Sequence, residues 1–340
     1  MRAAPDFWGK PPGLAADLLA PIGAAWDIAG RLRRAFAHPY HAPIPVVCVG
    51  NLVAGGAGKT PVALAVCAVL VAKGVDVHVV TSGYGGQLRG PVQADPARHD
   101  ASLVGDEALL LAQRASCWIA RDRVTGARAA VASGAHAILL DDGFQNPTVA
   151  KSLSLVVVDA DYGFGNARVI PAGPLRETRR RGLARADAVV LLGAEADADS
   201  ARGIGIGGGL PIVHAQLAPV DGERLVGLRL FAFAGIGRPQ KFFASLRAVG
   251  ADLVGAQAFA DHHPFRVDEI ETLLRQADRG RAQLITTAKD FVRVPTALRG
   301  GIEVLEVEIR WLDPAALEGL MAPVIQAADG NGRDLAEHRR

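Results

Sequence analysis

Several features that would place this chain in a special class are scarce in its sequence. It has three cysteines, Cys48, Cys67 and Cys117, and no two of them form a CxxC pair. An odd number of isolated cysteines argues against a disulfide scaffold and predicts buried thiols in a reducing compartment. The formal net charge is only +2, so bulk attraction to nucleic acid is not indicated.

The sequence also lacks an apolar run long enough to cross a membrane. A spanning helix needs about 20 apolar residues, and the stretch from Leu14 to Ala29 is shorter and includes two aspartates and a proline. No basic region of the signal-peptide type precedes it. An arginine cluster follows it at Arg31, Arg33 and Arg34. Two interpretations stay open, an amphipathic helix in a membrane surface and a helix packed on its own domain.

Apolar residues are plentiful. They make up 50% of the chain, which is enough for a large core and two domains. Nearly continuous Val, Ile and Leu runs alternate with helical stretches, and such runs are typical of a parallel sheet whose two faces are covered by helices. The first set of predicted strands covers 43–50, 75–81, 135–141, 153–159 and 187–192.

The composition changes near residue 200. Residues 194–202 are rich in Ala and Asp, and 203–209 contain five glycines, which is typical of a linker. A second alternating set predicts a smaller α/β unit, and the tail from Ala327 has the composition of a disordered segment. The second set of predicted strands covers 211–217, 228–234, 252–258, 283–287 and 302–308.

The strongest functional signal lies between Val46 and Thr60. The stretch reads as an apolar strand, a glycine-rich loop and Lys-Thr at the start of a helix, which is the order of a phosphate-binding loop, although Val53 replaces the usual first glycine. Lys59 can reach the β- and γ-phosphates of a nucleotide, and the Thr60 hydroxyl can ligate Mg²⁺. The predicted nucleotide-binding residues are Val53, Ala54, Gly55, Gly56, Ala57, Gly58, Lys59 and Thr60.

A second apolar run ends in two acids. Residues 137–140 are followed by Asp141 and Asp142, and a parallel strand would place both carboxylates at the sheet edge beside the phosphate-binding loop. Mg²⁺ keeps several waters and needs only one or two carboxylates. The sequence therefore predicts a magnesium site formed by Thr60, Asp141 and Asp142, and an ordinary Asp-Asp-Gly turn is the alternative.

Two further acids and two histidines are candidates for chemistry. Asp106 and Glu107 precede a helical run, where acids also serve as an N-cap and a first-turn charge. His262 and His263 follow a predicted strand. Adjacent histidines do not both face one site from a regular strand, so at most one of them is catalytic. A solvated loop is the alternative for this pair.

Two glycine-containing segments complete the set. Residues 82–86 follow the second predicted strand, so they would lie at the same sheet edge as the phosphate-binding loop. Residues 171–177 combine Pro and Gly with Arg176 and Glu177, and three arginines follow at 179–181. Such a segment suits either a grip on phosphate or anionic lipid, or the solvated start of a charged helix.

Taken in this order, the motifs resemble one family, the tetraacyldisaccharide 4′-kinases of lipid A biosynthesis. The resemblance covers about residues 40–295, and the combination of DDGFQ with PAGPLRE is its most specific part. That family's loop also lacks the first glycine. The matching stretches are VGNLVAGGAGKTP, SGYGG, VGDE, LDDGFQ, DYGFGNARVIPAGPLRE, FADHHPF and TAKD.

The resemblance implies a reaction and roles for residues. ATP, with Mg²⁺, would phosphorylate the 4′-hydroxyl of a tetraacylated glucosamine disaccharide 1-phosphate. Asp106 would be the base at the acceptor hydroxyl, with His262 as its orienting partner and Lys59 as the third catalytic residue. Glu107, Arg176 and Glu177 would lie at the substrate, and the arginines at 179–181 would be a candidate grip for its 1-phosphate.

The resemblance also bears on location and organisation. An acylated substrate stays partly in the bilayer, so the membrane-surface interpretation of the N-terminal helix is favoured. The expected location is the cytoplasmic face of a Gram-negative inner membrane, to which the enzyme would bind peripherally. We expect a monomer and no nucleic-acid partner. The predicted division is a membrane-associating helix (1–35), a P-loop kinase domain (36–200), a smaller α/β domain (201–326) and a disordered tail (327–340).

Two other functions are kept as alternatives. One is a nucleotide-switched, membrane-associated ATPase without a small-molecule acceptor. The other is a P-loop GTPase, against which the absence of an Asn-Lys-x-Asp guanine motif counts. The sequence departs from the family's usual residues at Ser82, Ala108, Asn146 and Ala288, and none of these positions is assigned to catalysis.

Overall fold

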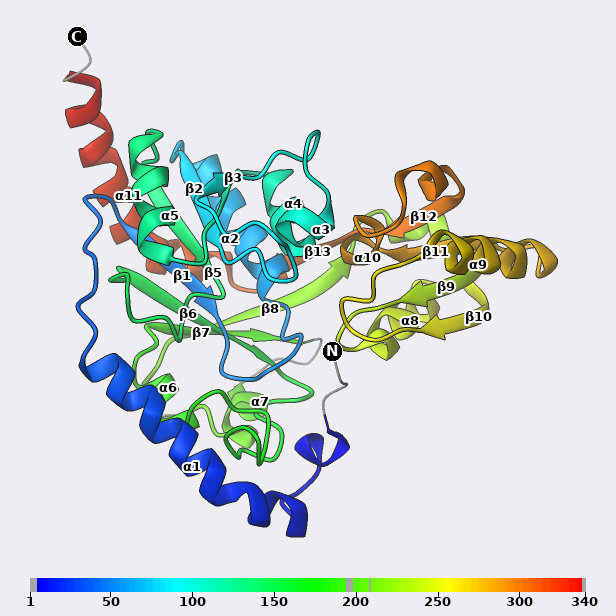
Figure 1. Ribbon diagram of the computed structural model, residues 1–340, viewed down its shortest axis with the longest axis horizontal. Helices are drawn as coiled ribbons and strands as arrows, with labels where there is room; N and C mark the ends of the chain where they lie inside the picture. Colours follow the sequence, from blue (N-terminus) through cyan, green and yellow to red (C-terminus); the bar gives the residue numbers. More distant parts are fainter. Residues whose placement is uncertain (1–4, 194–197, 208, 338–340) are drawn as a thin grey trace.

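The computed structural model describes residues 5–193, 198–207 and 209–337, which form two β-sheets with helices on their faces (Figure 1). The larger sheet has nine strands. All neighbouring strands in it are parallel except at its two edges, where the outermost strand runs antiparallel. In spatial order the strands are β13 (Val307–Trp311), β8 (Ile212–Pro219), β7 (Ala188–Leu192), β6 (Leu153–Asp159), β1 (Val46–Gly50), β5 (Ala137–Asp141), β2 (Val77–Thr81), β4 (Ser116–Ile119) and β3 (Val92–Gln93).

Both faces of this sheet are covered by helices, as the apolar runs predict. Every residue of β1, β2, β5, β6 and β7 is buried. One face packs against α2 (Lys59–Ala72), α3 (Ala101–Val104), α4 (Asp106–Ala112) and α11 (Pro314–Glu337). The other packs against α5 (Arg123–Ala132), α6 (Arg179–Leu183) and α7 (Ala198–Gly203). We refer to this sheet and its helices as the larger unit.

The smaller unit contains a four-stranded parallel sheet. Helix α8 (Pro239–Ala248) packs on one face through Phe242, Phe243 and Leu246. Helix α9 (Val267–Arg279) packs on the other through Ile270 and Leu273. The strands are, in spatial order, β10 (Asp252–Ala258), β9 (Arg229–Ala234), β11 (Gln283–Thr287) and β12 (Ile302–Leu305). The short helix η2 (Gly222–Leu225) precedes β9, and α10 (Ala288–Phe291) and η3 (Thr296–Gly301) lie between β11 and β12 in the chain.

The structure differs from the predicted domain division at the strands that connect the two units. The strand predicted at 211–217 is β8, which pairs with β7 in the larger sheet. The strand predicted at 302–308 is divided between β12 in the smaller sheet and β13 in the larger one. The smaller unit is therefore inserted between β8 and β13. The predicted boundary differs because an apolar run indicates that a strand is present but not which strand it pairs with.

The predicted disordered tail also differs from the structure. Helix α11 runs from Pro314 to Glu337, and 338–340 lie outside the described residues. Leu317, Met321 and Ala328 are buried on the larger unit. A helix anchored in this way extends at little further cost, because nucleation is the expensive step.

The N-terminal segment forms η1 (Asp6–Gly9) and the helix α1 (Leu14–Ala35), and the predicted helix is confirmed. Figure 1 shows α1, in dark blue, along the outside of the larger unit beside α6. Asp27 of α1 pairs with Arg181, and the indole Nε1 of Trp26 donates to the carbonyl oxygen of Arg176 at 3.3 Å. None of the helices in the described ranges is long and apolar enough to cross a membrane.

Candidate active site

The phosphate-binding loop connects β1 to α2 at the carboxyl edge of the larger sheet. Gly58 is the N-cap of α2 and has a φ of 79°, and a Cβ there would lie 2.4 Å from Cδ2 of Leu192. The left-handed φ favours glycine at this position, since any other residue would be strained there and would push Leu192 aside. Lys59 and Thr60 follow as the first residues of α2. The free N–H groups and positive dipole end of the helix therefore face the loop, where they favour a phosphate.

A second segment holds the start of this loop. The amide of Ala54 donates to the carbonyl oxygen of Pro174 at 2.7 Å, and the amide of Arg176 donates to the carbonyl oxygen of Leu52 at 2.8 Å. The Arg176 guanidinium then binds Asp142 through Nη1–Oδ1 at 3.0 Å and Nη2–Oδ2 at 3.1 Å. Two parallel charge-assisted bonds fix both the distance and the plane of the carboxylate.

Asp142 and Asp141 differ sharply in their surroundings. Lys59 Nζ lies 3.8 Å from Asp142 Oδ2. Burial alone would raise the pKa of Asp142, but the charges of Lys59 and Arg176 outweigh it and lower that pKa. Asp141 is 1% exposed, and neither of its oxygens has a hydrogen-bond partner among the described residues. Burial, with the charges of Glu107 and Asp142, raises the pKa of Asp141 to about 7.

These surroundings fit a bound cation at Asp141. A buried carboxylate with two unpartnered oxygens is costly unless a cation compensates it. In the described part of the chain, no group of three or more His, Cys, Asp or Glu side chains is arranged to hold a metal. Mg²⁺ that is bound mainly by phosphates and water needs only one or two protein carboxylates. Of the three predicted metal ligands, Asp142 is occupied by Arg176, whereas Asp141 keeps both oxygens available and Thr60 is buried in the first turn of α2.

Asp106 and His262 come together from different units. Asp106 begins α4, whereas His262 lies in the loop after β10, and Nδ1 of His262 lies 2.9 Å from Oδ2 of Asp106. Burial would raise the pKa of Asp106, but the hydrogen bond from His262 and the charges of Lys289, His262 and Arg293 lower it. An ionised carboxylate oriented by an imidazole is a proton acceptor.

The predicted substrate-binding residues lie in different surroundings. Glu107 binds Lys289 Nζ of α10 through Oε1 at 3.0 Å, so it lies beside the Asp106–His262 pair. Arg176 lies with the magnesium candidates. Glu177 is 1% exposed and accepts a bond from Arg185 Nη2 at 2.6 Å. Its carboxylate therefore stabilises the segment that follows Arg176, and among the described residues no hydrogen bond or ion pair joins it to Asp106.

The arginines at 179–181 are partly engaged by the protein itself. Arg179 donates to the carbonyl oxygen of Ile204 at 3.2 Å, Arg181 pairs with Asp27 of α1, and Arg180 is exposed. Asn146, one of the departures from the family pattern, accepts bonds from Thr148 through Oδ1 and so closes its own turn.

Sequence reasoning missed two cations of the smaller unit. Lys289 and Arg293 are four residues apart, and each pairs with one of the consecutive acids at the start of α4. The TAKD stretch includes Lys289 and ends three residues before Arg293. The spacing of a lysine and an arginine on one turn was a signal in the sequence, but nothing in it indicated which acids they meet.

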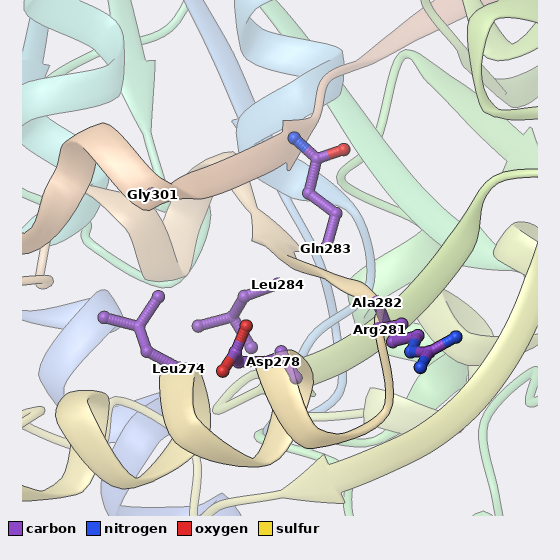
Figure 2. Close-up of a pocket in the computed structure, with 8 residues that line it drawn as sticks. Leu274, Asp278, Arg281, Ala282, Gln283, Leu284 and Gly301 are labelled. Carbon is purple, nitrogen blue, oxygen red and sulfur yellow. The ribbon is translucent and has the colours of Figure 1, made fainter.

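A hollow on the smaller unit is separate from this site. It lies between the end of α9 and β11, where Leu274, Asp278 and Gln283 line it (Figure 2). None of its lining residues belongs to the phosphate-binding loop, to the magnesium candidates or to the Asp106–His262 pair.

Known proteins resemble this chain over most of its length. The family described as tetraacyldisaccharide-1-P 4′-kinase matches residues 15–326. The tetraacyldisaccharide 4′-kinase of Rhodospirillum centenum is 52% identical over 97% of this chain and 99% of its own length. That of Dinoroseobacter shibae is 53% identical over 92% of this chain and 95% of its own length.

A solved structure shares the fold. The crystal structure of LpxK from Aquifex aeolicus in complex with ATP matches with a TM-score of 0.72 and 22% sequence identity, and covers 92% of this chain and all of the other. At this identity the likeness concerns the fold, which is that of a P-loop kinase with a second, smaller α/β unit.

Proposed function

This chain belongs to the tetraacyldisaccharide-1-P 4′-kinase family, and we propose that Asp106, His262 and Lys59 carry out its reaction. The reaction is the transfer of the γ-phosphate of ATP to the 4′-hydroxyl of a tetraacylated glucosamine disaccharide 1-phosphate in lipid A biosynthesis. ATP and Mg²⁺ are its nucleotide and metal. Residues 53–60 hold the triphosphate, and Glu107 and Arg176 lie at the substrate.

The proton and the phosphate move in opposite directions. The 4′-oxygen attacks the γ-phosphorus while its proton passes to Asp106, and the bond between the γ-phosphorus and the bridging oxygen breaks, so that ADP leaves with the electron pair. His262 holds the carboxylate through Oδ2. Lys59 and the loop amides stabilise the charge that develops on the phosphate oxygens. Bound Mg²⁺ neutralises phosphate charge, and Asp141 and Thr60 are the side chains that would hold it.

One observation carries this assignment. An ionised carboxylate from the larger unit and an imidazole from the smaller unit are 156 residues apart in sequence and 2.9 Å apart in space. The loop that carries His262 is linked to the phosphate-binding loop through Gly237, since a Cβ there would lie 3.2 Å from the backbone N of Gly56 and 3.5 Å from Oδ2 of Asp261, the residue before His262. A base is needed where a sugar hydroxyl is the nucleophile, and a nucleotide switch without an acceptor needs none there.

A transfer assay tests the function. Radiolabelled ATP should label a tetraacylated disaccharide 1-phosphate in mixed micelles, and release of free phosphate without this acceptor should be slow. ATP turnover that is independent of the acceptor, with no labelled lipid, would instead favour the nucleotide-switched ATPase. The family and its relatives do not favour that alternative.

The exposed face of α1 supports peripheral binding to a membrane surface. Several large apolar side chains on this helix are more than half exposed, although such groups are usually buried. Arg31 and Arg33 are exposed near its end, where cations favour anionic lipid. We propose that the enzyme is a monomer and that it binds the cytoplasmic face of the inner membrane peripherally, with α1 as the docking element. The exposed residues include Leu14, Leu18, Ile22, Trp26, Leu32 and Phe36.

Removing the exposed apolar groups should weaken membrane association. Deletion of 1–35 should do so, but it also removes contacts such as Asp27–Arg181. We therefore expect the triple variant Leu14→Gln, Leu18→Gln and Ile22→Gln to pellet less with anionic liposomes and to lose activity on embedded lipid, while ATP binding is retained. Each buried methylene contributes about 0.8 kcal/mol to such binding.

A matched variant controls for general loss of apolar surface. Val71, Val226 and Val267 are 52%, 61% and 52% exposed on other elements, and their joint replacement by glutamine should leave pelleting unchanged. If the α1 variant pellets as the wild-type protein does, α1 is simply a helix packed on its own domain.

The division into units is likewise a proposal. The pairing of β8 with both β7 and β13 supports a kinase domain built from residues 36–219 and 307–337, with 220–306 inserted as the smaller domain. The N-terminal helix remains a separate element.

A further inference from the structure

We propose that Arg293 is a positioning residue that holds Oδ2 of Asp106 and leaves Oδ1 as the atom that accepts the proton. This inference rests on the proposed function, in which Asp106 is the base. Nε of Arg293 lies 3.3 Å from Oδ2 of Asp106, and the two side chains are 7% and 2% exposed. A charge pair this far from water is weakly screened.

The guanidinium is itself held in one place. Nη1 donates to the carbonyl oxygen of His263 at 2.9 Å, and Nη2 donates to that of Gly235 at 2.9 Å and to Oδ1 of Asp290. Nε also donates to the carbonyl oxygen of Lys289 at 3.3 Å. These partners all belong to the smaller unit. Arg293 therefore meets Asp106 as a rigid group and not as a flexible surface arginine.

The two oxygens of Asp106 consequently differ. Oδ2 faces both the imidazole of His262 at 2.9 Å and the Arg293 cation. Within the described residues, Oδ1 has one hydrogen-bond donor, the amide of Glu107 at 2.9 Å. A carboxylate oxygen has two lone pairs, so Oδ1 keeps one that can accept the acceptor's hydroxyl proton. In that step the O–H bond of the sugar breaks and an Oδ1–H bond forms.

The charges remain balanced after this step. Protonated Asp106 is neutral, but Arg293 keeps Asp290, which is fully buried, as its counter-ion. A second ion pair, between Glu107 and Lys289, connects the same two segments as the pair between Asp106 and Arg293. Two cations of one short segment thus meet two consecutive acids of the other unit, so the orientation of the base depends on how α10 lies against α4.

Arginine suits this position better than lysine does. A guanidinium has five donors in a planar fork, whereas an ammonium is a compact point charge. Arg293→Lys keeps the positive charge. Its single ammonium group cannot contact the carbonyl oxygens of His263 and Gly235 and, at the same time, the carboxylates of Asp106 and Asp290. We expect kcat to fall about tenfold in Arg293→Lys and about 100-fold in Arg293→Gln, with KM for ATP within about twofold of wild type, since small misplacement of a reacting group costs up to this much.

Arg299 provides a matched control. It is another guanidinium of the smaller unit that donates to two carbonyl oxygens, those of Val292 and Val294, and lies over an aromatic ring, that of Phe291. In the described part of the chain, its hydrogen bonds go to these carbonyl oxygens and not to Asp106. Arg299→Gln should lower the melting temperature, because two carbonyl oxygens lose their donor, while kcat stays at the wild-type value.

A double-mutant cycle separates positioning from mere structural support. In the Asp106→Asn background, Arg293→Lys should lower the residual kcat by less than about twofold, because residues that act as a unit are not additive. A full tenfold loss in that background would overturn the inference and leave Asp106 as the base. A wild-type kcat in Arg293→Lys would also overturn it.

The same cycle distinguishes this inference from the proposed function. If Asp106→Asn by itself keeps the wild-type kcat, the base assignment is wrong and the inference falls with it. Circular dichroism and nucleotide binding establish which variants are folded. Arg293→Lys and Arg293→Gln each decide the question, so one folded variant of the two is enough.

Discussion

Replacing Lys59 with alanine should lower kcat at least about 100-fold, in line with the loss of one group that stabilises transition-state charge. Lys59 stands at the first position of α2, and its Nζ lies 3.8 Å from Oδ2 of Asp142. The fold should survive, because Asp142 keeps its two bonds to Arg176. Radiolabel transfer to the lipid acceptor measures the loss, and thermal unfolding checks the fold.

Lys73, just after the other end of the same helix, is the control for this substitution. Its Nζ lies 3.3 Å from Oε1 of Glu318, and both side chains are about half exposed. An exposed ion pair of this kind contributes at most about 1 kcal/mol to stability, so Lys73→Ala should transfer phosphate at the wild-type rate. Near-normal transfer by folded Lys59→Ala would remove the assignment of the phosphate-binding loop.

The second large effect is expected at the base. Asp106→Asn should lower kcat far more than it raises KM for ATP, because a base acts in the transition state. The hydrogen bond from His262 and the charges of its cationic neighbours hold the pKa of Asp106 below the ordinary value, against the effect of burial. The carboxylate is therefore already ionised at neutral pH, and a loss of activity between pH 8 and 6 would have to come from another group.

The partner histidine should matter less than the base. His262→Ala should cost less than Asp106→Asn, and the double variant should be less than additive if the two side chains act as a unit. His263 is the natural control, since its Nε2 lies 3.0 Å from Oε2 of Glu269. His263→Ala should keep most of the activity. Fully additive losses at Asp106 and His262 would argue against the pair.

The chemical parts of this enzyme could be recognised from the sequence because they are local. A glycine-rich loop between a strand and Lys59-Thr60 is encoded by consecutive residues, as is the run that ends at Asp141. The parallel character of the larger sheet was also predictable, since strands buried on both faces read as continuous apolar runs. The family resemblance added roles to positions whose chemistry the residues alone left open.

Other features depended on contacts between residues far apart in sequence. The strand at 212–219 was predicted to belong to the smaller unit, but it pairs with the larger sheet. The chain beyond Ala327 was predicted to be disordered, but it continues α11. Both outcomes depend on packing partners that no local sequence pattern identifies. The same is true of the different surroundings of Asp141 and Asp142. Asp141 and Asp142 are adjacent in sequence, but Asp142 has a left-handed φ of 52° and its carboxylate binds Arg176.

The chemical groups themselves can be read from the order of the residues: a loop that can bind phosphate, acids that can hold a metal or accept a proton, and an apolar stretch too short to span a bilayer. Which of these groups meet depends on the folding of distant segments onto one another. Asp106 acquires His262 and Arg293 because the smaller unit is inserted between β8 and β13 and lies with α10 against α4. The ionisation and orientation of a carboxylate depend on charges within a few ångströms, and here those charges come from residues more than 150 positions away.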